Sequence, residues 1–323
     1  MVAMTHPSQL SELGDFSPSD SIVEIDGLSR RFGSNLALDD VDFRVPAGSV
    51  VGLVGENGAG KTTLIKHILG LLKAQSGSVR VFGLDPVAEP VRVLSRIGYL
   101  SEEPDMPGWM RIHELIRYIA AFYPTWDTIY AEELREEFQL DPKQKVKQLS
   151  KGQRARAGLL IALAYRPDLL LLDEPSSGLD PIVRRDILGA IIRTIADEGR
   201  TVLFSSHLLA EVERVSDQVA MIRSGKILFC DSMERIKQGH ARLTLRFQSP
   251  QSRPPDLAGA LSWDGAAYEW TAICEGSASR LQAAAAHLGA QVIAQSGVSL
   301  DEIFLARAGA NREPAQAAEG NTP

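Results

Sequence analysis

The sequence predicts an α/β protein with a parallel sheet covered by helices, an antiparallel β subdomain, a helical insertion and a small C-terminal α+β domain. Short and nearly all-apolar runs at Val50–Val54, Leu169–Leu172 and Thr201–Phe204 are typical of strands that are buried on both faces. A helical pattern over Pro181–Glu198 separates the last two runs. Strand, helix and strand in this order indicate a parallel sheet.

The overall composition is that of a globular protein that holds a large core and an accessory unit. The chain has 323 residues, of which 44% are hydrophobic and 23% charged. Its formal net charge of −7 argues against nucleic acid as the main partner. Cys230 and Cys274 lack metal-ligand spacing and indicate a reducing compartment.

No segment has the composition of a membrane span or of a signal peptide. The most apolar stretch, Ala157–Leu172, is interrupted by Arg166-Pro167-Asp168, whereas a spanning helix needs about 20 apolar residues in succession. The first twenty residues are polar and lack the apolar centre of a signal peptide. We therefore expect a chain that does not cross a membrane itself.

Composition divides the chain into four segments. Residues 1–20 and 310–323 are polar, and we expect a disordered leader and a disordered tail there. Residues 21–238 form the first domain. Residues 239–309 form the second, in which Arg242–Phe247, Tyr268–Cys274 and Gln291–Ala294 are expected strands, Ser279–Leu288 and Asp301–Ala306 expected helices, and Ser249–Pro255 an expected loop.

Three local patterns complete the first domain. Alternating apolar and polar residues between Ile22 and Val45 predict antiparallel strands with one solvated face. Residues 104–165 are helical in pattern and form an insertion in the sheet domain. Met221–Leu228 predicts a hairpin that turns at Ser224-Gly225.

A glycine-rich loop follows the first buried strand and precedes an apolar helix. The spacing Gly55-x-x-x-x-Gly60-Lys61-Thr62 is that of a P-loop. Its backbone N–H groups cradle phosphates, Lys61 reaches the β- and γ-phosphates, and the Thr62 hydroxyl binds Mg²⁺. The expected nucleotide-binding residues are Gly55, Glu56, Asn57, Gly58, Ala59, Gly60, Lys61, Thr62 and Thr63.

Two carboxylates end the second buried strand. Because ligands bind at the carboxyl ends of parallel strands, Asp173 and Glu174 are expected to face the P-loop. Asp173 suits the Mg²⁺ shell, and Glu174 suits a general base that positions water for attack on the γ-phosphate. The alternative is a strand that ends in solvated acids.

The order of GENGAGKTT, LSKGQ, LLLLDEP, SGLD and a histidine after an apolar strand resembles that of ATP-binding-cassette (ABC) ATPases, over residues about 22–238. The resemblance implies a P-loop NTPase core with ATP and Mg²⁺ as ligands. Lys151 replaces the first glycine of the family's LSGGQ signature. Glu102 stands where the family usually has Gln, and Glu103 is its neighbour.

The resemblance also assigns roles to single residues. Ser150 and Gly152 would contact the γ-phosphate, with Gln153 in the same motif; alternatively, this segment is an ordinary helix N-cap. Glu102 would bind Mg²⁺ or orient water, and Glu103 takes this role if the register shifts by one.

Three further positions match the family's pattern. Phe32 would stack on adenine, or else is a core residue of a strand. Asp180 belongs to the loop that reaches a second subunit, and before Pro181 it is also a helix N-cap. His207 would act in catalysis by sensing the γ-phosphate, beside Lys61 and Glu174, or is a structural histidine.

The function implied by the resemblance is that of the ATP-hydrolysing subunit of a membrane transporter. Two copies would clasp ATP head to tail, on the inner face of the cell membrane, where separate permease subunits hold them. Residues 104–126, with Trp109, Met110 and Tyr118, would line a groove for the permease or fill the insertion's own core. The tail Ser299–Gly309 resembles that of exporter subunits.

Two other classes of function stay open at this stage. A soluble ABC ATPase that acts on ribosomes or DNA is disfavoured by the single cassette, the absence of sustained heptads and the negative charge. A regulatory cassette that binds ATP with little hydrolysis is disfavoured by Lys61, Asp173 and Glu174 but favoured by Lys151 and Glu102. The sequence does not indicate a transported substrate.

Overall fold

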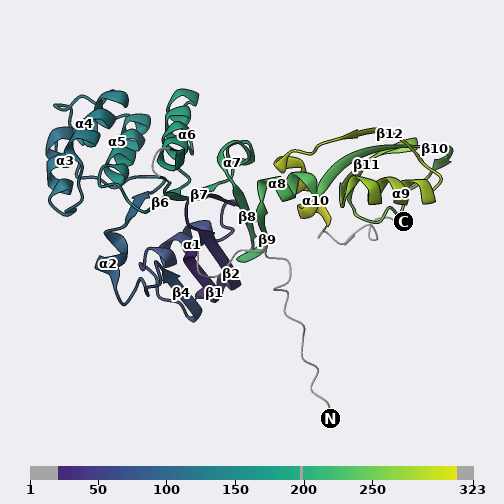
Figure 1. Ribbon diagram of the computed structural model, residues 1–323, viewed down its shortest axis with the longest axis horizontal. Coiled ribbons are helices and arrows are strands. Elements are labelled where there is room, and N and C mark those ends of the chain that lie inside the picture. Colours follow the sequence, from purple (N-terminus) through teal and green to yellow (C-terminus); the bar gives the residue numbers. More distant parts are fainter. Residues whose placement is uncertain (1–20, 197–198, 311–323) are drawn as a thin grey trace, which may run out of the picture. The chain divides into compact units, whose positions relative to one another are not determined.

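A computed structural model describes residues 21–196 and 199–310 (Figure 1). The expected leader over residues 1–20, and the expected tail apart from Ala310, lie outside these residues. The chain divides into two compact units, Met1–Asp231 and Ser232–Pro323. Helix α8 (Met233–Gln238), counted above with the first domain, falls in the second unit. No helix within the described ranges is long and apolar enough to span a membrane.

The first unit is built on a six-stranded sheet with the order β5-β6-β7-β3-β8-β9. Neighbouring strands from β5 to β8 run parallel, which confirms the predicted parallel sheet. Every residue of β3, β6 and β7 is buried, as their apolar runs predict. The strands are β3 (Val50–Val54), β5 (Ile97–Leu100), β6 (Leu169–Asp173), β7 (Thr201–Ser206), β8 (Gln218–Arg223) and β9 (Lys226–Ser232).

The predicted hairpin at the edge of this sheet is confirmed. Strands β8 and β9 are neighbours, and the two residues between them, Ser224 and Gly225, have φ angles of 48° and 80°. Positive φ at both central residues is the geometry of a tight hairpin turn whose twist matches that of the flanking strands.

Helices α1 (Lys61–Ile68), α2 (Pro90–Leu94), α6 (Pro181–Ala196) and α7 (Leu209–Val215) accompany the sheet. Helix α1 buries its apolar side chains completely, and α6 buries Val183 and Ile187 on the predicted face. Helix α7 packs directly on β3, because a Cβ on Gly52 would lie 2.3 Å from Val212 Cγ1. Only glycine permits this approach of helix and strand.

The antiparallel subdomain is a three-stranded sheet with the order β2-β1-β4. Its strands are β1 (Ser21–Phe32), β2 (Asn35–Pro46) and β4 (Ser76–Val81). In the register of β1 and β2, Val23 opposes Val45 and Ile25 opposes Phe43, and all four side chains join one core with β3 and α1. The predicted antiparallel strands are therefore confirmed, with the P-loop strand and helix sharing their core.

The predicted helical insertion lies between β5 and β6. It contains α3 (Ile112–Ala120), α4 (Thr128–Glu137), a short 3₁₀ turn (Val146–Gln148) and α5 (Lys151–Leu163), and no strand occurs within residues 104–165 (Figure 1). Met110 is buried, so it belongs to the insertion's own core. Trp109 and Tyr118 are exposed and do not.

The second unit is an α+β fold. Its antiparallel sheet has the order β11-β10-β12, formed by β10 (His240–Gln251), β11 (Ala260–Glu275) and β12 (Gln291–Ser296). Helices α9 (Ala278–His287) and α10 (Leu300–Ala310) complete it. Leu243, Leu245 and Trp270 form part of a separate hydrophobic core. The loop expected from Ser249 begins only after Gln251, because β10 continues through a register shift.

One buried side chain on α1 makes stability dependent on pH. His67 is 1% exposed, its Nδ1 lies 2.8 Å from Thr63 O, and its Nε2 has no hydrogen-bond partner among the described residues. Burial is the main cause that lowers its pKa; the hydrogen bond to Thr63 O opposes this shift, and the nearby Arg30 lowers the pKa further. The unfolded chain therefore binds more protons than the folded chain, so stability falls as the pH decreases through about 6.5.

We expect the melting temperature to decrease between pH 7.5 and pH 5.5, and to decrease less in His67→Leu. Differential scanning calorimetry at the two pH values measures the difference between the variant and wild type. His287→Leu is the matched control, because His287 Nδ1 has the same contact with the carbonyl four residues earlier but its side chain is exposed. An equal decrease in wild type and His67→Leu would contradict the prediction.

Candidate functional site

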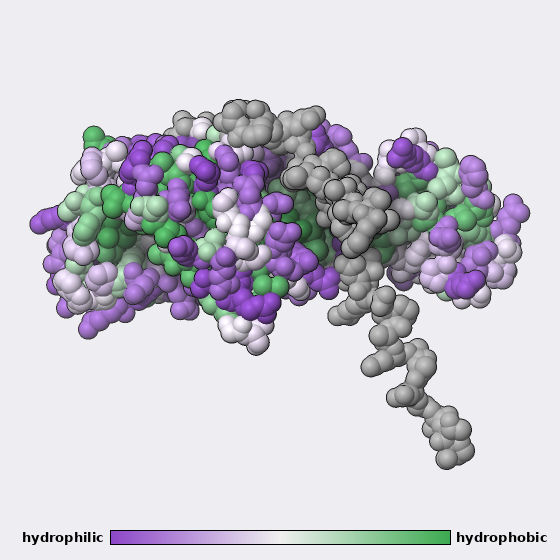
Figure 2. Space-filling model, turned by 90° about the horizontal axis from the view of Figure 1, so that it is seen from below, coloured by the Kyte–Doolittle hydropathy of each residue, from purple (hydrophilic) through white to green (hydrophobic). Residues whose placement is uncertain are grey.

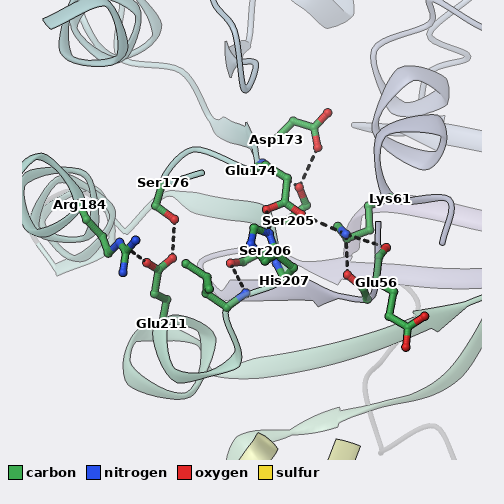
Figure 3. Close-up of polar contacts among 12 residues, drawn as sticks. Glu56, Lys61, Asp173, Glu174, Ser176, Arg184, Ser205, Ser206, His207 and Glu211 are labelled. Atoms are coloured by element: carbon green, nitrogen blue, oxygen red, sulfur yellow. Dashed lines mark hydrogen bonds and ion pairs between the residues drawn. The ribbon is translucent and has the colours of Figure 1, made fainter. Parts of the chain in front are cut away.

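The carboxyl ends of three neighbouring strands bring the predicted site residues to one edge of the sheet. In the parallel register, Val54 of β3 opposes Ser206 of β7, and Asp173 of β6 opposes Ser205. The P-loop follows Val54, Glu174 follows Asp173, and His207 follows Ser206. Lys61, Glu174 and His207 therefore converge from three separate segments of the chain (Figure 3).

The P-loop is closed by protein on one side and open on the other. A Cβ on Gly55 would lie 2.3 Å from Ile222 O, and a Cβ on Gly60, whose φ is 115°, would lie 2.7 Å from Ala37 O. Gly58 also has a positive φ, of 81°, yet no heavy atom lies within 4 Å of its Cβ position. Two glycines thus allow the loop to nest against β2 and β8, while the exposed side remains free for a ligand.

The remaining P-loop residues divide in the same way. Ala59 is buried, whereas Glu56 and Asn57 are exposed beside Gly58. Thr62, in the first turn of α1, is exposed as well, so its hydroxyl is accessible. The N-terminus of α1 begins at Lys61 and has no side-chain cap, which leaves its first N–H groups available to an anion.

Lys61 is buried at the mouth of this loop. Its Nζ donates hydrogen bonds to Gly55 O at 2.6 Å and Glu56 O at 3.1 Å, and forms an ion pair with Glu174 Oε1 at 3.0 Å. The side chains of Lys61 and Glu174 are 5% and 10% exposed. Two of the three ammonium donors thus bond to backbone carbonyls, and the charge of the group faces the Glu174 carboxylate.

Glu174 lies between Lys61 and His207. Its Oε2 is 2.7 Å from His207 Nδ1, so one carboxylate contacts a cation with one oxygen and an imidazole with the other. The backbone of Glu174 is in the left-handed region, with φ of 49°, which a non-glycine residue rarely adopts. This bend after β6 directs Glu174 toward Lys61, away from its neighbour Asp173.

Asp173 is held by a residue that the sequence analysis did not single out. Ser205 Oγ donates to Asp173 Oδ1 at 2.7 Å and accepts from Glu174 N at 2.9 Å. Burial raises the pKa of Tyr99 to about 12, and the negative charge of Asp173 adds to this shift. The available signal was a pair of hydroxyl side chains, Ser205 and Ser206, between the apolar run of this strand and His207.

The predicted metal ligands are only partly gathered. Asp173 is buried at the strand end, Thr62 is exposed on α1, and Glu102 is exposed on the loop after β5. Over residues 21–196 and 199–310, no cluster of three metal-ligating side chains occurs. Mg²⁺ in nucleotide sites takes one or two protein ligands and completes its shell with phosphates and water, so one carboxylate and one hydroxyl fit its chemistry.

The signature segment is organised as a helix N-cap. Ser150 Oγ accepts from Gln153 N at 3.2 Å, and Ser150 N donates to Gln153 Oε1 at 3.0 Å. Gly152 lies against α6, where a Cβ would be 2.7 Å from Val183 Cγ2. Ser150 is therefore the N-cap of α5, a role that is compatible with a nucleotide contact by the same segment. None of the hydrogen bonds or ion pairs found among the described residues joins Ser150–Gln153 to the Lys61 cluster.

Asp180 is likewise a helix N-cap. Near it, Lys151 and Glu102, the two departures from the family pattern, line one cavity. Asp180 Oδ1 accepts from Ile182 N at 2.9 Å and Val183 N at 3.1 Å, and the latter bond is the main cause that lowers its pKa. Lys151 lies beside the loop Ser177–Asp180, because a Cβ on Gly178 would be 2.7 Å from Lys151 Nζ. Together with Glu102, Glu103 and other residues it lines a cavity of about 500 Å³.

Phe32 is 43% exposed at the end of β1, which excludes the interpretation as a core residue. The Arg30 guanidinium lies 4.7 Å from the centre of its ring. Because β1 turns into β2 at this point, and Ala37 of β2 contacts Gly60, the exposed ring belongs to the surface near the P-loop.

A phosphate-binding loop, a buried lysine and two carboxylates at the end of one buried strand define this class of protein as a P-loop NTPase. Comparison with known proteins is more specific. Residues 38–177 match the family described as ABC transporter. The ATP-binding cassette MJ0796, solved as a dimer in a post-hydrolysis state bound to ADP and Pi, has a TM-score of 0.58 at 21% identity; the match covers 65% of this chain and 98% of that one.

Two curated relatives show the same family. The uncharacterized ABC transporter ATP-binding protein YdbJ of Bacillus subtilis is 35% identical, over 76% of this chain and 78% of its own length. The daunorubicin/doxorubicin resistance ATP-binding protein DrrA of Streptomyces peucetius is 32% identical, over 89% of this chain and 92% of its own. The chain belongs to this family. It is the ATP-binding subunit of an ABC transporter, and its ATP hydrolysis drives transport.

Proposed function

We propose that two copies of this chain bind two ATP molecules between them, head to tail. Gly55–Thr63 of one copy and Ser150–Gln153 of the other hold each nucleotide. One observation carries the proposal: within a single copy, Lys61, Glu174 and His207 are already joined, while the signature segment has its contacts with α6 instead. The dimeric state of MJ0796 agrees with this arrangement.

The residues of the site take the following roles in hydrolysis. Glu174 is the general base for the attacking water, and His207 orients it and contacts the γ-phosphate. Lys61 exchanges its contact with Glu174 for the β- and γ-phosphates when ATP binds, which frees the carboxylate. Phe32 stacks on adenine, and Asp180 reaches the second copy.

Mg²⁺ would be held by Thr62 and Asp173, together with Glu102 or its neighbour Glu103. When bound, the ion neutralises charge that develops on the phosphates. Within the chain, Ser205 keeps Asp173 in place, since its hydroxyl donates to one carboxylate oxygen and leaves the other available. The chain thus supplies a hydroxyl and an oriented carboxylate for a hard cation.

The partner is a separate permease on the inner face of the cell membrane, and the transporter exports its substrate. The relationship to DrrA, whose name refers to drug resistance, supports export. The helical insertion offers a surface for the permease: Trp109, Tyr118 and Phe122 are 71%, 47% and 63% exposed. The rings of Tyr118 and Phe122 pack edge to face at 5.2 Å. Figure 2 shows hydrophobic residues among hydrophilic ones over these helices, at left.

Fractionation of the source cells tests this assignment. We expect the chain to sediment with membranes and to co-purify with an integral protein after mild detergent extraction. Purification with ribosomes or DNA, in place of any integral protein, would show that the chain is a soluble ATPase of the other class and would overturn the proposal.

The exposed aromatic residues provide a direct prediction. Replacing Trp109 and Phe122 together by Ser removes most of this apolar surface, and we expect at least about a tenfold loss of the membrane-bound fraction, because aromatic anchors dominate binding at interfaces. ATPase activity of the purified chain stays within about twofold of wild type. Leu71→Ser, at a residue 62% exposed outside the insertion, is the control and stays bound. Unchanged membrane binding of the double variant would contradict this docking surface.

A further inference from the structure

The contact between Glu174 and His207 links two segments of the chain, and a second contact links the same two segments. Ser176 lies two residues after Glu174, and its Oγ donates to Glu211 Oε2 at 2.5 Å. Glu211 lies four residues after His207, in the first turn of α7. Its other oxygen, Oε1, is 2.9 Å from Arg184 Nε on α6 (Figure 3). The two links run in parallel between one pair of segments.

The second link is more deeply buried than an ordinary surface contact. Ser176 is 2% and Glu211 is 7% exposed, whereas the His207 side chain is 38% exposed. A buried carboxylate is costly unless hydrogen bonds and an opposite charge compensate it, and Ser176 and Arg184 supply one of each. A neutral side chain of similar size would fill the same space without the free-energy cost of burying a charge. The presence of the carboxylate therefore indicates a requirement for these particular contacts.

The positions of the two partners show what the carboxylate holds. Ser176 directly precedes the loop Ser177–Asp180, and Arg184 follows it within the first turn of α6, where Arg184 N donates to Asp180 O at 3.1 Å. One carboxylate thus fastens both ends of this loop. Because α7 begins just after His207, the loop and the histidine are fastened to the same helix.

We infer that Glu211 is a positioning residue for ATP hydrolysis. It holds the segment of Glu174 against the segment of His207, and it fixes Ser177–Asp180 for contact with the second copy. Among the described residues, the hydrogen bond and ion pair of the Glu211 side chain go to Ser176 and Arg184, and to no residue assigned to the nucleotide. This inference rests on the proposed role of Glu174 as general base. Glu211 therefore affects the rate of the chemical step and not the affinity of the P-loop for ATP.

The test is Glu211→Gln, which keeps the shape and an acceptor for Ser176 but removes the charge that faces Arg184. We expect kcat to fall at least about tenfold, because displacements near 1 Å in a catalytic arrangement cost up to about 100-fold. The Kd for ATP, measured by fluorescence titration, stays within about twofold of wild type. Glu133→Gln makes the same chemical change at an exposed site on α4 and leaves both values unchanged.

Two further variants divide the contact into its halves. Ser176→Ala removes only the bond to the loop, and Arg184→Met removes only the ion pair. We expect each to lower kcat, and we expect Arg184→Met to add nothing in the Glu211→Gln background, since residues that act as one unit are not additive. Ser176→Ala is the smallest change and tests the inference even where Glu211→Gln is poorly folded.

Two results would overturn the inference. One is a kcat within twofold of wild type for folded Glu211→Gln and Ser176→Ala. The other is a parallel loss of kcat, ATP affinity and melting temperature, which would make Glu211 a structural residue only. Failure of the proposed function is a separate result: Glu174→Gln would then hydrolyse ATP at the wild-type rate, whatever Glu211 does.

Discussion

Glu174→Gln is expected to lower the rate of ATP hydrolysis by about 10²–10⁴-fold, the usual contribution of a general base. The amide keeps the shape of the side chain but cannot accept the proton of the attacking water. It also cannot form the ion pair with Lys61, which lies 3.0 Å from Glu174 Oε1. Lys61 is then released to the phosphates, so ATP binding is retained or strengthened.

Two measurements on the purified chain check this prediction. Phosphate release gives kcat, with Glu133→Gln as the control for an acid-to-amide change on the surface. Light scattering with Mg²⁺ and ATP gives the mass of the complex, and we expect the variant to be a stable dimer because hydrolysis no longer separates the copies. Turnover equal to that of wild type would eliminate Glu174 as the base. A variant that stays monomeric with ATP would refute the shared site.

Lys61→Met has the second largest expected effect. It removes the ammonium group that contacts Gly55 O, Glu56 O and Glu174 Oε1, and with it the positive charge at the mouth of the P-loop. We expect ATP affinity to fall and kcat to fall by at least about 10²–10³-fold, as when one preorganised donor at a developing charge is removed. Loss of a cation from a buried ion pair also destabilises the fold.

Two companion variants separate charge from geometry at this position. Lys66→Met removes a lysine from the exposed face of the same helix and should change neither ATP affinity nor kcat. Lys61→Arg keeps the charge, yet we expect no rescue, because a planar guanidinium does not fit among three acceptors arranged around one ammonium group. Calorimetry reports the loss of stability separately. Full activity of Lys61→Arg would show that charge alone is sufficient.

Much of the architecture was predictable because it is encoded locally. The apolar runs of β3, β6 and β7 and the glycine spacing of the P-loop identify their structure over fewer than ten residues each. Strands β4 and β5 were not predicted. Residues of β4 are mostly exposed, and β5 has only four residues, so neither carries a periodic signal.

The sequence predicted part of the site. The part that it did not predict consists of contacts between residues that are far apart in the chain. The parallel order of β6 and β7 aligns their ends, so Glu174 reaches His207, Ser205 reaches Asp173 and Ser176 reaches Glu211. The two residues of each pair are more than 30 positions apart in the chain. A serine or glutamate in a helix or strand has many possible partners, and nothing in its neighbours along the chain selects one. The exposure of the Phe32 ring likewise depends on the tertiary structure and not on its neighbours along the chain.

The sequence by itself thus determined which chemistry this protein carries: a loop for phosphates, a lysine, two acids and a histidine, each recognisable from short-range spacing. Only the tertiary structure decided how these groups are paired, with Glu174 shared by Lys61 and His207 and with Glu211 fastening the loop beside them. The physical reason is that motifs record local backbone requirements, whereas side-chain contacts depend on which distant segments the sheet places side by side.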